Sequence, residues 1–426
     1  MITCIDSLNQ IDIVIVGNEI VSGAVQDENA RYACKRLSSA GFRIRGVITV
    51  GDVFEHIRSA VSEAAKRSPF VIVAGGLGPT SDDITTQCVA DAFNRPLERD
   101  ERLFSLIRRF VEDRDLGWNP ALEKLALLPR GARLVDPHPR ACGYVIQEAN
   151  STLFFLPGVP SETRRLLDRH VIPVLLKAVS GLSHVVQRVI RLFGTDEASV
   201  EQALKGLKDL YPTTSIGYYP NFPEVHVSFS AAGVSEEEAQ SRLDRIEAEI
   251  RRRLDPYVFG TDKTRLETAV GDLLRSKGLA IALAESCTGG LIGHRITSVP
   301  GSSDYFERGV VVYSNRAKME LLGIDPALLE RHGAVSAECA QAMARGVRRV
   351  AGTDVGLSST GIAGPGGGSE EKPVGTVYIG LATHKGALSE HFRFFGNREQ
   401  IKLVTSETAL YRVWRYLNGD PFFHCL

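Results

Sequence analysis

The chain has 426 residues, of which 43% are hydrophobic and 24% charged, and its 50 basic and 51 acidic residues give a formal net charge of −1. This length predicts two or three domains, and the balanced charge argues against a nucleic acid as the main partner. The chain has no signal-peptide pattern, no run near the roughly 18 apolar residues of a membrane span, and seven scattered cysteines without a CxxC pair, which together indicate a reduced, cytoplasmic protein.

The first 178 residues alternate strand and helix patterns. Apolar runs predict strands at residues 11–17, 42–52 and 70–78, and amphipathic runs predict helices at 28–41 and 55–68. This alternation predicts a parallel sheet covered by helices, and it continues through STLFFLPGVPSE at 151–162. We therefore expect an α/β domain over residues 1–178.

The stretch FVIVAGGLGPTSDDITTQCVADAF, residues 70–93, indicates a strand, a glycine loop and a helix. We expect Thr80 or Ser81 to cap the helix, with Asp82 and Asp83 in its first turn, where carboxylates are favoured in any protein. The functional alternative is a phosphate pocket beside a carboxylate pair that could hold Mg²⁺ or a similar hard cation. The density of glycine at a strand end favours the functional alternative.

Residues 179–262 change in character. Strand patterns at 184–194 and 223–233 alternate with helix patterns at 196–207 and 235–254. A small α+β module is expected here, and the many charges of its second helix fit a solvated face.

The C-terminal part begins with a helix pattern at 264–278 and a strand at 279–285, directly followed by Ser286. As a nucleophile, Ser286 would lie at a strand end, with helix N–H groups to hold an oxyanion and Gly289 and Gly290 to admit a substrate. As a structural residue, Ser286 or Thr288 would cap the helix. Cys287 is a rival nucleophile, although a buried thiol is its more usual role.

A base for Ser286 is suggested by GVVVYSNRAKMELLG, residues 309–323. If Ser314 or Asn315 caps the following helix, Lys318 falls in its first turn, where the helix dipole disfavours a cation and burial would favour the neutral amine. A neutral lysine can act as a general base, and Tyr313 would relay the proton or hold the lysine. The alternatives are a surface lysine and a core aromatic residue.

A third feature is the glycine-dense loop in LSSTGIAGPGGG, residues 357–368. Its glycines permit positive φ and expose backbone N–H groups to an anion such as phosphate. No GK[ST] follows, which excludes a Walker loop. The alternative is a mobile surface loop.

Together, AESCTGGLI, SSDYFERGVVVYSNRAKMELLGI, HGAVSAECAQAMARG and STGIAGPGGGSEEKPVGTVYIG resemble the nicotinamide-nucleotide amidase domain of the CinA family, over most of residues 263–426. The resemblance implies hydrolysis of nicotinamide mononucleotide to nicotinate mononucleotide and ammonia, without metal or cofactor. It implies Ser286 as nucleophile, served by Lys318 and Tyr313. The implied substrate contacts are Thr288, Gly289, Gly290, Asn315, Thr360, Gly361, Gly364, Gly366 and Gly367.

The N-terminal part resembles the molybdopterin-binding-like domain of the same family, through GNEIVSG, Asn29, GGLGPTSDD and LPGVPSE. This resemblance implies metal-dependent cleavage of ADP-ribose to AMP and ribose 5-phosphate. Asp82 and Asp83 would hold Mg²⁺ or Co²⁺. The implied substrate contacts are Glu19, Asn29, Gly75, Gly76, Gly78, Thr80, Asp82 and Asp83.

Three departures from the family pattern fall in this half. Asn18 replaces a threonine, residues 26–29 read Gln-Asp-Glu-Asn in place of Val-Asn-Thr-Asn, and Lys124 and Leu125 replace an Arg-Gln pair. These changes remove a hydroxyl, an amide and a guanidinium from contacts to phosphate or adenine.

The combined prediction is two α/β domains with mostly parallel sheets, at 1–178 and 263–426, joined by a KH-like α+β module at 179–262. We expect a cytoplasmic, homodimeric enzyme of pyridine-nucleotide salvage that acts on nicotinamide mononucleotide and ADP-ribose. One alternative is an N-terminal domain that binds a pterin or nucleotide without turnover. Another is a competence-associated, nucleic-acid-binding factor, which would need the GxxG clamp of a KH module; residues 179–262 contain none.

Overall fold

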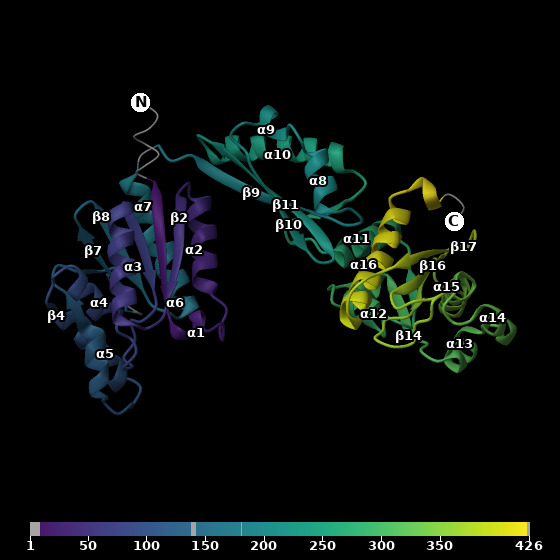
Figure 1. The fold of residues 1–426 in the computed structure, drawn as a ribbon, viewed down its shortest axis with the longest axis horizontal. Helices are drawn as coiled ribbons and strands as arrows, with labels where there is room; N and C mark the ends of the chain where they lie inside the picture. Colours follow the sequence, from purple (N-terminus) through teal and green to yellow (C-terminus); the bar gives the residue numbers. More distant parts are fainter. Residues whose placement is uncertain (1–8, 138–141, 180, 424–426) are drawn as a thin grey trace. The chain divides into compact units, whose positions relative to one another are not determined.

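The computed structural model describes residues 9–137, 142–179 and 181–423. The chain divides into two compact units, Met1–Gln187 with Ala231–Leu243, and Arg188–Ser230 with Asp244–Leu426, and Figure 1 shows the elements of each. Within the described ranges, none of the helices combines the length and the apolar character that a membrane crossing requires.

The N-terminal unit is built on a six-stranded sheet in the order β2-β1-β3-β8-β7-β6. The first four strands of this order are parallel, and β7 and β6 are antiparallel additions. The strands are β1 (Gln10–Val16), β2 (Arg43–Val50), β3 (Phe70–Ala74), β6 (Arg133–Leu134), β7 (Tyr144–Glu148) and β8 (Ser151–Leu156), with a separate pair of β4 (Leu97–Arg99) and β5 (Leu127–Pro129). The helices are α1 (Asn18–Val21), α2 (Glu28–Ser39), α3 (Phe54–Arg67), α4 (Thr85–Ala92), α5 (Glu101–Glu112), η1 (Pro120–Ala126), α6 (Pro160–Leu166), η2 (Leu167–Val171) and α7 (Ile172–Ala178).

Both faces of this sheet are apolar, because each is covered by helices. Along β1, Ile13 and Ile15 pack into one core with α2 and the α6–α7 segment, whereas Val14 and Val16 pack into a second core with α3 and α4. Figure 1 shows α2 and α6 on one side of the sheet and α3 and α4 on the other. The loops after β1, β3 and β8 therefore meet at the edge formed by the carboxyl ends of the parallel strands.

A four-stranded antiparallel sheet in the order β10-β11-β9-β12 follows. Its strands are β9 (His184–Leu192), β10 (Ser215–Asn221), β11 (Glu224–Gly233) and β12 (Val258–Thr261), and its helices are α8 (Glu197–Ala203), α9 (Leu207–Leu210) and α10 (Glu236–Leu254). The strands β10 and β11 form a tight hairpin from Ser215 paired with Ser230 to Asn221 paired with Glu224. This segment is the expected α+β module.

The C-terminal sheet has five strands in the order β14-β13-β15-β16-β17. The first three are parallel, and β16 and β17 are antiparallel. The strands are β13 (Ile281–Glu285), β14 (Phe306–Val311), β15 (Val355–Gly361), β16 (Thr376–Ala382) and β17 (Ala387–Arg393). The helices are α11 (Leu266–Lys277), α12 (Leu291–Thr297), η3 (Ser302–Asp304), α13 (Asn315–Leu322), α14 (Pro326–His332), α15 (Ala337–Ala351), α16 (Arg398–Leu417) and η4 (Pro421–Phe423).

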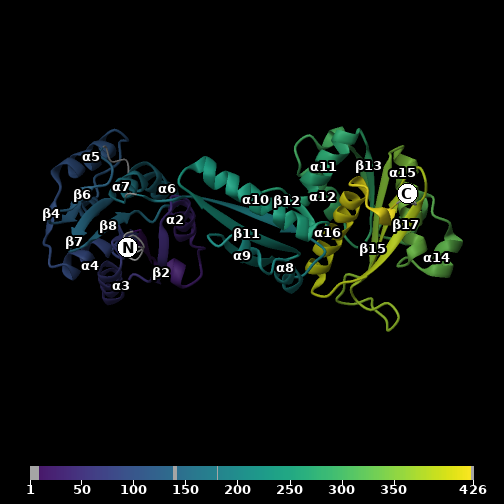
Figure 2. The ribbon, with the colours of Figure 1, turned by 90° about the horizontal axis from the view of Figure 1, so that it is seen from above.

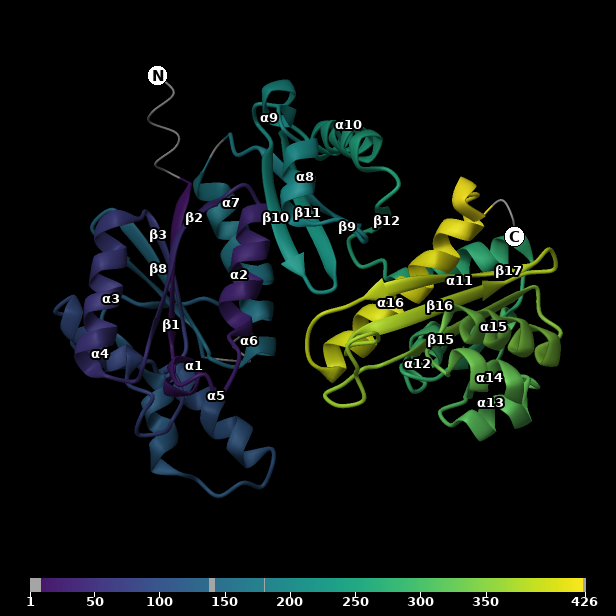
Figure 3. The ribbon, with the colours of Figure 1, turned by 45° about the vertical axis from the view of Figure 1, so that its right-hand side comes forward.

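This sheet is also covered on both faces. Ile281 and Leu283 pack with α11, α12 and α16, while Ala282 and Ala284 pack with α13, α14 and α15. In Figures 2 and 3 the strands lie between these two groups of helices. The prediction of two mostly parallel α/β folds around a small α+β module is confirmed.

Candidate functional site

Ser286 is the first residue after β13, at the carboxyl edge of the C-terminal sheet. It is buried, and its N–H donates to the carbonyl of Ser359 on β15 at 2.9 Å. Its own carbonyl accepts the N–H of Gly289 at 3.2 Å. Ser286 is thus held in a tight turn between two parallel strands, where open α/β sheets bind ligands.

Lys318 lies next to Ser286 although it belongs to α13. Its Nζ is 3.2 Å from Ser286 Oγ, 2.8 Å from the carbonyl oxygen of Val312 and 3.2 Å from that of Tyr313. The side chain is 1% exposed. Ser314 caps α13 by accepting the N–H of Ala317, so the lysine falls in the first helical turn as expected.

Burial lowers the pKa of Lys318, against a smaller opposite influence of Cys339 and Cys287. A neutral amine has two N–H bonds and one lone pair. Because the carbonyls of Val312 and Tyr313 can accept both N–H bonds, the lone pair is free to face the Ser286 hydroxyl. The pair has the geometry of a nucleophile and its general base.

The neighbouring thiol of Cys287 is a poor candidate for the nucleophile. Burial raises the pKa of Cys287 to about 12. Since the thiolate is the reactive form of cysteine, a thiol that stays protonated at neutral pH is chemically inert.

The start of α12 differs from the expectation. The N–H groups of Gly290, Ile292 and Gly293 donate to the carboxylate of Glu285, at 3.0, 3.0 and 2.8 Å. Neither Ser286 nor Thr288 caps the helix, since Thr288 is buried with its hydroxyl 2.7 Å from that of Ser359. These three N–H groups are therefore not free to hold an oxyanion, because a carboxylate satisfies them more strongly than water does.

Tyr313 is 61% exposed, so the interpretation as a core aromatic residue is wrong. Its carbonyl contacts Lys318, and its hydroxyl accepts from Arg398 Nη2 at 3.1 Å. Arg398 Nη1 donates to the carbonyl of Gly364 at 2.6 Å. The side chain of Tyr313 is thus linked, through Arg398, to the glycine-dense loop of residues 357–368.

The predicted contact residues fall into two groups. Thr360, whose hydroxyl donates to the carbonyl of Ala334 at 2.7 Å, is buried, and a Cβ at Gly361 would lie 2.7 Å from the carbonyl oxygen of Thr376, so both have packing roles. Thr288 is also buried. The remaining six lie on the turn, the helix start or the loop of residues 357–368: Gly289, Gly290, Asn315, Gly364, Gly366 and Gly367, of which Gly364 is buried, Gly290 is half-buried and the other four are exposed.

Two basic residues at this edge were not predicted. Arg398 is the first residue of α16, and Lys402 lies one turn later, with its Nζ 3.6 Å from the position of a Cβ on Gly289. Cations at a helix start are unfavourable unless an anion shares the site. The sequence feature that could have identified these two residues is a pair of basic residues, four positions apart, at the start of a capped helix.

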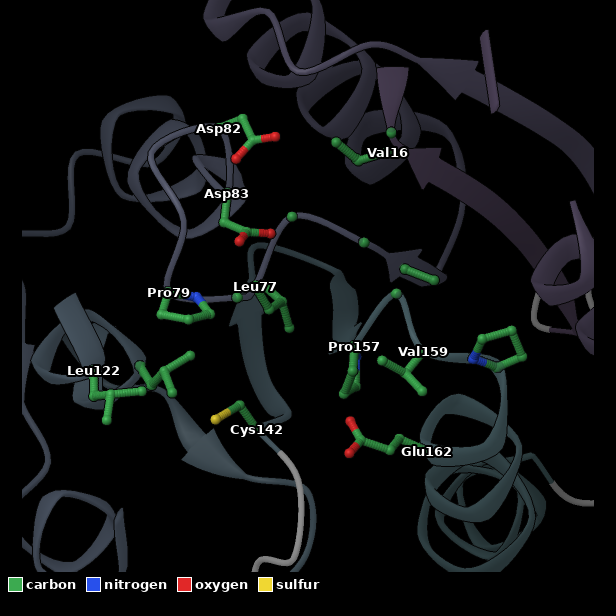
Figure 4. Close-up of a pocket in the computed structure, with 18 of the residues that line it drawn as sticks. Val16, Leu77, Pro79, Asp82, Asp83, Leu122, Cys142, Pro157, Val159 and Glu162 are labelled. Carbon is green, nitrogen blue, oxygen red and sulfur yellow. The ribbon is translucent and has the colours of Figure 1, made fainter. Parts of the chain in front are cut away.

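The N-terminal unit has a pocket of about 1340 Å³ at the carboxyl edge of its sheet. Figure 4 shows Asp82 and Asp83 on the glycine loop side, with Glu162 and Val159 on the opposite side. The pocket's charged lining residues are Glu19, Asp27, Glu28, Asp52, Asp82, Asp83, Asp113 and Glu162, with Arg109 and Arg114. This excess of carboxylates favours a cation together with an anionic ligand.

Asp52, just after β2, is a further carboxylate that the sequence analysis missed. Burial raises its pKa, and the charges of Glu19, Asp82 and Asp83 act in the same direction. Its position after a parallel strand, in the run TVGD, was the available signal. Asp52, Glu19, Asp82 and Asp83 all line the pocket.

The glycine loop is shaped by packing. A Cβ at Gly75 would lie 2.0 Å from the carbonyl oxygen of Val16, and one at Gly76 would lie 2.2 Å from Thr85 Oγ1. The expected helix start is wrong: α4 begins at Thr85, and Asp83 instead accepts the N–H of Thr80 at 3.0 Å inside the loop. The loop closes on its own side chains, which leaves Asp82 ahead of the helix, beside the pocket.

Asn29 has a side-chain oxygen without a hydrogen-bond partner in the described structure. It is buried and lines the pocket, and its Nδ2 donates to the carbonyl of Gly158 at 2.7 Å. Its Oδ1 has no partner among the described residues. A buried amide oxygen without a partner is costly, so a ligand donor is expected there.

The departures from the family pattern have visible consequences. The side-chain oxygen of Asn18 accepts the N–H of Asp52 at 3.1 Å, and Lys124 Nζ donates to the carbonyl of Thr80 at 2.5 Å. Leu125 lines the pocket as an apolar side chain. Lys124 therefore keeps a cation near Asp82. Leu125 offers no polar side-chain group to the pocket that it lines.

The carboxylates of the N-terminal pocket supply only part of the coordination that a magnesium-like ion needs. In the described part of the chain, no group of three or more His, Cys, Asp or Glu side chains converges as a metal cage. Magnesium is often bound by one or two carboxylates together with water and substrate phosphates. Asp82 and Asp83 fit this donor set.

Comparisons with known proteins cover nearly the whole chain. Three family models match in succession: a probable molybdopterin binding domain at 12–177, the damage-inducible protein CinA KH domain at 187–260, and the CinA C-terminal domain at 263–417. A CinA-like protein of Geotalea uraniireducens is 42% identical over 93% of this chain and 94% of its own, and one of Geobacter sulfurreducens is 44% identical over 93% and 96%. A crystal structure of the competence/damage inducible protein CihA of Agrobacterium tumefaciens matches with 40% identity and a TM-score of 0.35, over 36% of this chain and 94% of that one.

Proposed function

The chain belongs to the CinA family, and from this premise we propose that its C-terminal domain is an amidase that hydrolyses nicotinamide mononucleotide to nicotinate mononucleotide and ammonia. The observation that carries the proposal is the buried Lys318 amine, 3.2 Å from the Ser286 hydroxyl. A serine–lysine pair at a strand end supplies acyl-transfer chemistry without a metal.

The proposed reaction has two halves. Ser286 Oγ attacks the carboxamide carbon while Lys318 takes the hydroxyl proton, and the tetrahedral intermediate collapses as Lys318 returns the proton to the departing ammonia. Water, deprotonated by the same amine, then attacks the acyl-enzyme and releases nicotinate mononucleotide. Because Glu285 engages the N–H groups of Gly290, Ile292 and Gly293, the oxyanion would be held by N–H groups of the turn, at Cys287 and Thr288.

The substrate's phosphate is assigned to the start of α16. Arg398 and Lys402 bring two cations to a helix end that already favours an anion. Arg398 also contacts the Tyr313 hydroxyl, so phosphate binding would order the aromatic wall of the site.

The test is ammonia release from nicotinamide mononucleotide by the purified full chain. Ser286→Ala should abolish release and Cys287→Ala should keep most of it, with unchanged circular dichroism in both. Loss of activity in Cys287→Ala with retention in Ser286→Ala would assign the nucleophile to the thiol.

We also propose that the N-terminal pocket cleaves ADP-ribose to AMP and ribose 5-phosphate with a divalent ion. The unpartnered amide oxygen of Asn29 and the carboxylates around Asp52 favour this second activity. Asp82 and Asp83 would hold the ion, which would neutralise the diphosphate. Their own role would be to bring that charge into the pocket that Asn29 and Glu162 also line.

The alternative for this pocket is binding of a pterin or nucleotide without turnover. AMP release from ADP-ribose with Mg²⁺ or Co²⁺ separates the two. Binding of ADP-ribose without any AMP would support the binding module.

A further inference from the structure

Glu285, the last residue of β13, has a buried carboxylate that the proposed reaction does not use. Its side chain is 2% exposed. Oε2 accepts the N–H groups of Gly290 and Ile292, and Oε1 accepts that of Gly293. These donors form the positive end of α12, so the carboxylate is satisfied without a cationic side chain.

The main chain of Glu285 closes a hydrogen-bonded circuit through the catalytic pair. Its carbonyl accepts the N–H of Val312 at 2.8 Å, and the carbonyl of Val312 accepts from Lys318 Nζ at 2.8 Å. Lys318 Nζ in turn lies 3.2 Å from the hydroxyl of Ser286, the residue after Glu285. Glu285 is therefore linked to the nucleophile through the chain and to the base through Val312.

The direction in which the Glu285 carboxylate points affects the protonation of Lys318. If it faced Lys318, the two would form an ion pair that keeps the amine protonated and unable to act as a base. The carboxylate instead faces the N–H groups of α12, whereas the Lys318 amine lies against the Ser286 hydroxyl and the carbonyls of Val312 and Tyr313. Its negative charge is matched by the helix end.

We infer that Glu285 is a positioning residue of the amide hydrolysis, which ties the Ser286 turn to the start of α12 and keeps a negative charge away from Lys318. This inference rests on the proposed amidase function. Small displacements of a nucleophile from its attack geometry lower turnover without weakening substrate binding.

Two variants disturb the carboxylate in different ways. Glu285→Gln keeps the size of the side chain but turns an amide N–H₂ group toward backbone donors. Gly293→Ala adds a methyl carbon 3.4 Å from Oε1. The control is Asp325→Asn, which alters a carboxylate that accepts the N–H of Ala327 at the start of α14.

The measurements are kcat and KM for nicotinamide mononucleotide, the pH profile of kcat, and the rate at which a fluorophosphonate phosphonylates Ser286, each per folded protein from circular dichroism. Glu285→Gln should lower kcat and the phosphonylation rate by about 10- to 100-fold with KM changed by less than about threefold. Gly293→Ala should lower both less, and Asp325→Asn should leave both unchanged. The midpoint of the acid limb should stay within about half a pH unit of wild type, because the Glu285 carboxylate is bonded to the N–H groups of α12 and not to the amine.

Wild-type kcat and phosphonylation rate in folded Glu285→Gln, or a raised KM with unchanged kcat, would overturn the inference. If Glu285→Gln does not fold, Gly293→Ala decides: unchanged kcat and phosphonylation rate there would also overturn it. If the wild type releases no ammonia, the proposed function fails, and a fluorophosphonate rate that still depends on Glu285 would leave the positioning role standing.

Discussion

At the scale of single residues, two opposing effects act on the protonation of the Lys318 amine. Two backbone carbonyls accept from its amine and favour the protonated form, while burial favours the neutral form and lowers its pKa. Among the described residues, the hydrogen-bond partners of this amine are a hydroxyl and two carbonyls and not a carboxylate, which favours a usable base.

Replacing Lys318 distinguishes a base from a fixed cation. Lys318→Arg replaces the amine with a permanently charged guanidinium that cannot lose a proton near neutral pH, so we predict a loss of ammonia release of about 10³-fold or more, as large as in Lys318→Met. The measurement is initial rates at saturating substrate, with thermal melting as the control for folding. If Lys318→Arg kept a substantial rate, the amine would act as an electrostatic group only.

The sequence predicted Ser286 and Lys318 because each lies just after an apolar strand, and parallel strands bring such residues to one edge. It did not predict Arg398 or Asp52. Arg398 lies 112 positions from Ser286 in the chain numbering, and only the packing of α16 brings it to the glycine loop. Tyr313 was predicted to relay the proton or hold the lysine, with a core position as the alternative, and its exposed side chain excludes the core position.

At the scale of elements, the start of α16 carries Arg398 and Lys402, to which we assign the substrate's phosphate. We predict that Arg398→Ala and Lys402→Ala each raise KM for nicotinamide mononucleotide by about 10- to 100-fold, with a smaller effect on kcat, because each removes a charge-assisted contact to phosphate. The control substrate is nicotinamide riboside, which has no phosphate. Equal losses with both substrates would assign the two residues to structure.

Helix α16 also carries Glu407, which is buried beside Arg295 of α12 at 2.6 Å and has one unpartnered oxygen in the described structure. Burial raises the pKa of Glu407 to about 7 from its ordinary value of 4.5. The folded state therefore binds a proton that the unfolded state has lost between pH 4.5 and 7. This group's contribution to stability is full below pH 4.5 and is lost as the pH rises through 7.

The corresponding variant is Glu407→Gln, which cannot titrate. We predict that its free energy of unfolding, measured by urea titration, falls less than that of the wild type between pH 5 and 8, by up to about 3 kcal/mol. Parallel curves for the two proteins would show that Glu407 stays ionised in its ion pair with Arg295.

Element boundaries were the weakest part of the prediction. Helix α4 was expected to begin beside Thr80, because a hydroxyl followed by two carboxylates is a common helix start. In the structure, Asp83 accepts from Thr80 and the helix begins at Thr85. A local side-chain-to-backbone bond competed with the helix, which propensity alone does not reveal.

At the scale of the whole molecule, each of two α/β folds has a candidate site at the carboxyl edge of its own sheet. The order of elements was predictable, because alternation of apolar strands and amphipathic helices specifies such sheets. The pocket of the N-terminal unit depends on side chains from several loops, and no single motif defined it. The net charge of −1 gives no general attraction to nucleic acid.

Because the two candidate sites lie on separate sheets, a substitution in one site should leave the activity of the other unchanged. We predict that Asp83→Ala lowers AMP release from ADP-ribose by about 10²-fold while ammonia release is unchanged, and that a chelator has the same selectivity. Both activities are measured on one preparation of the full chain. A parallel loss of both would indicate a structural effect of the substitution.

The central claim is that Lys318 is uncharged beside Ser286 near neutral pH, and the most direct measurement is an NMR titration of its ε-carbon in protein labelled at lysine, assigned by comparison with Lys318→Met. The account predicts a resonance that titrates well below pH 10.5, the ordinary lysine value, and whose midpoint matches the acid limb of the rate profile. A midpoint at 10.5 or above would contradict it.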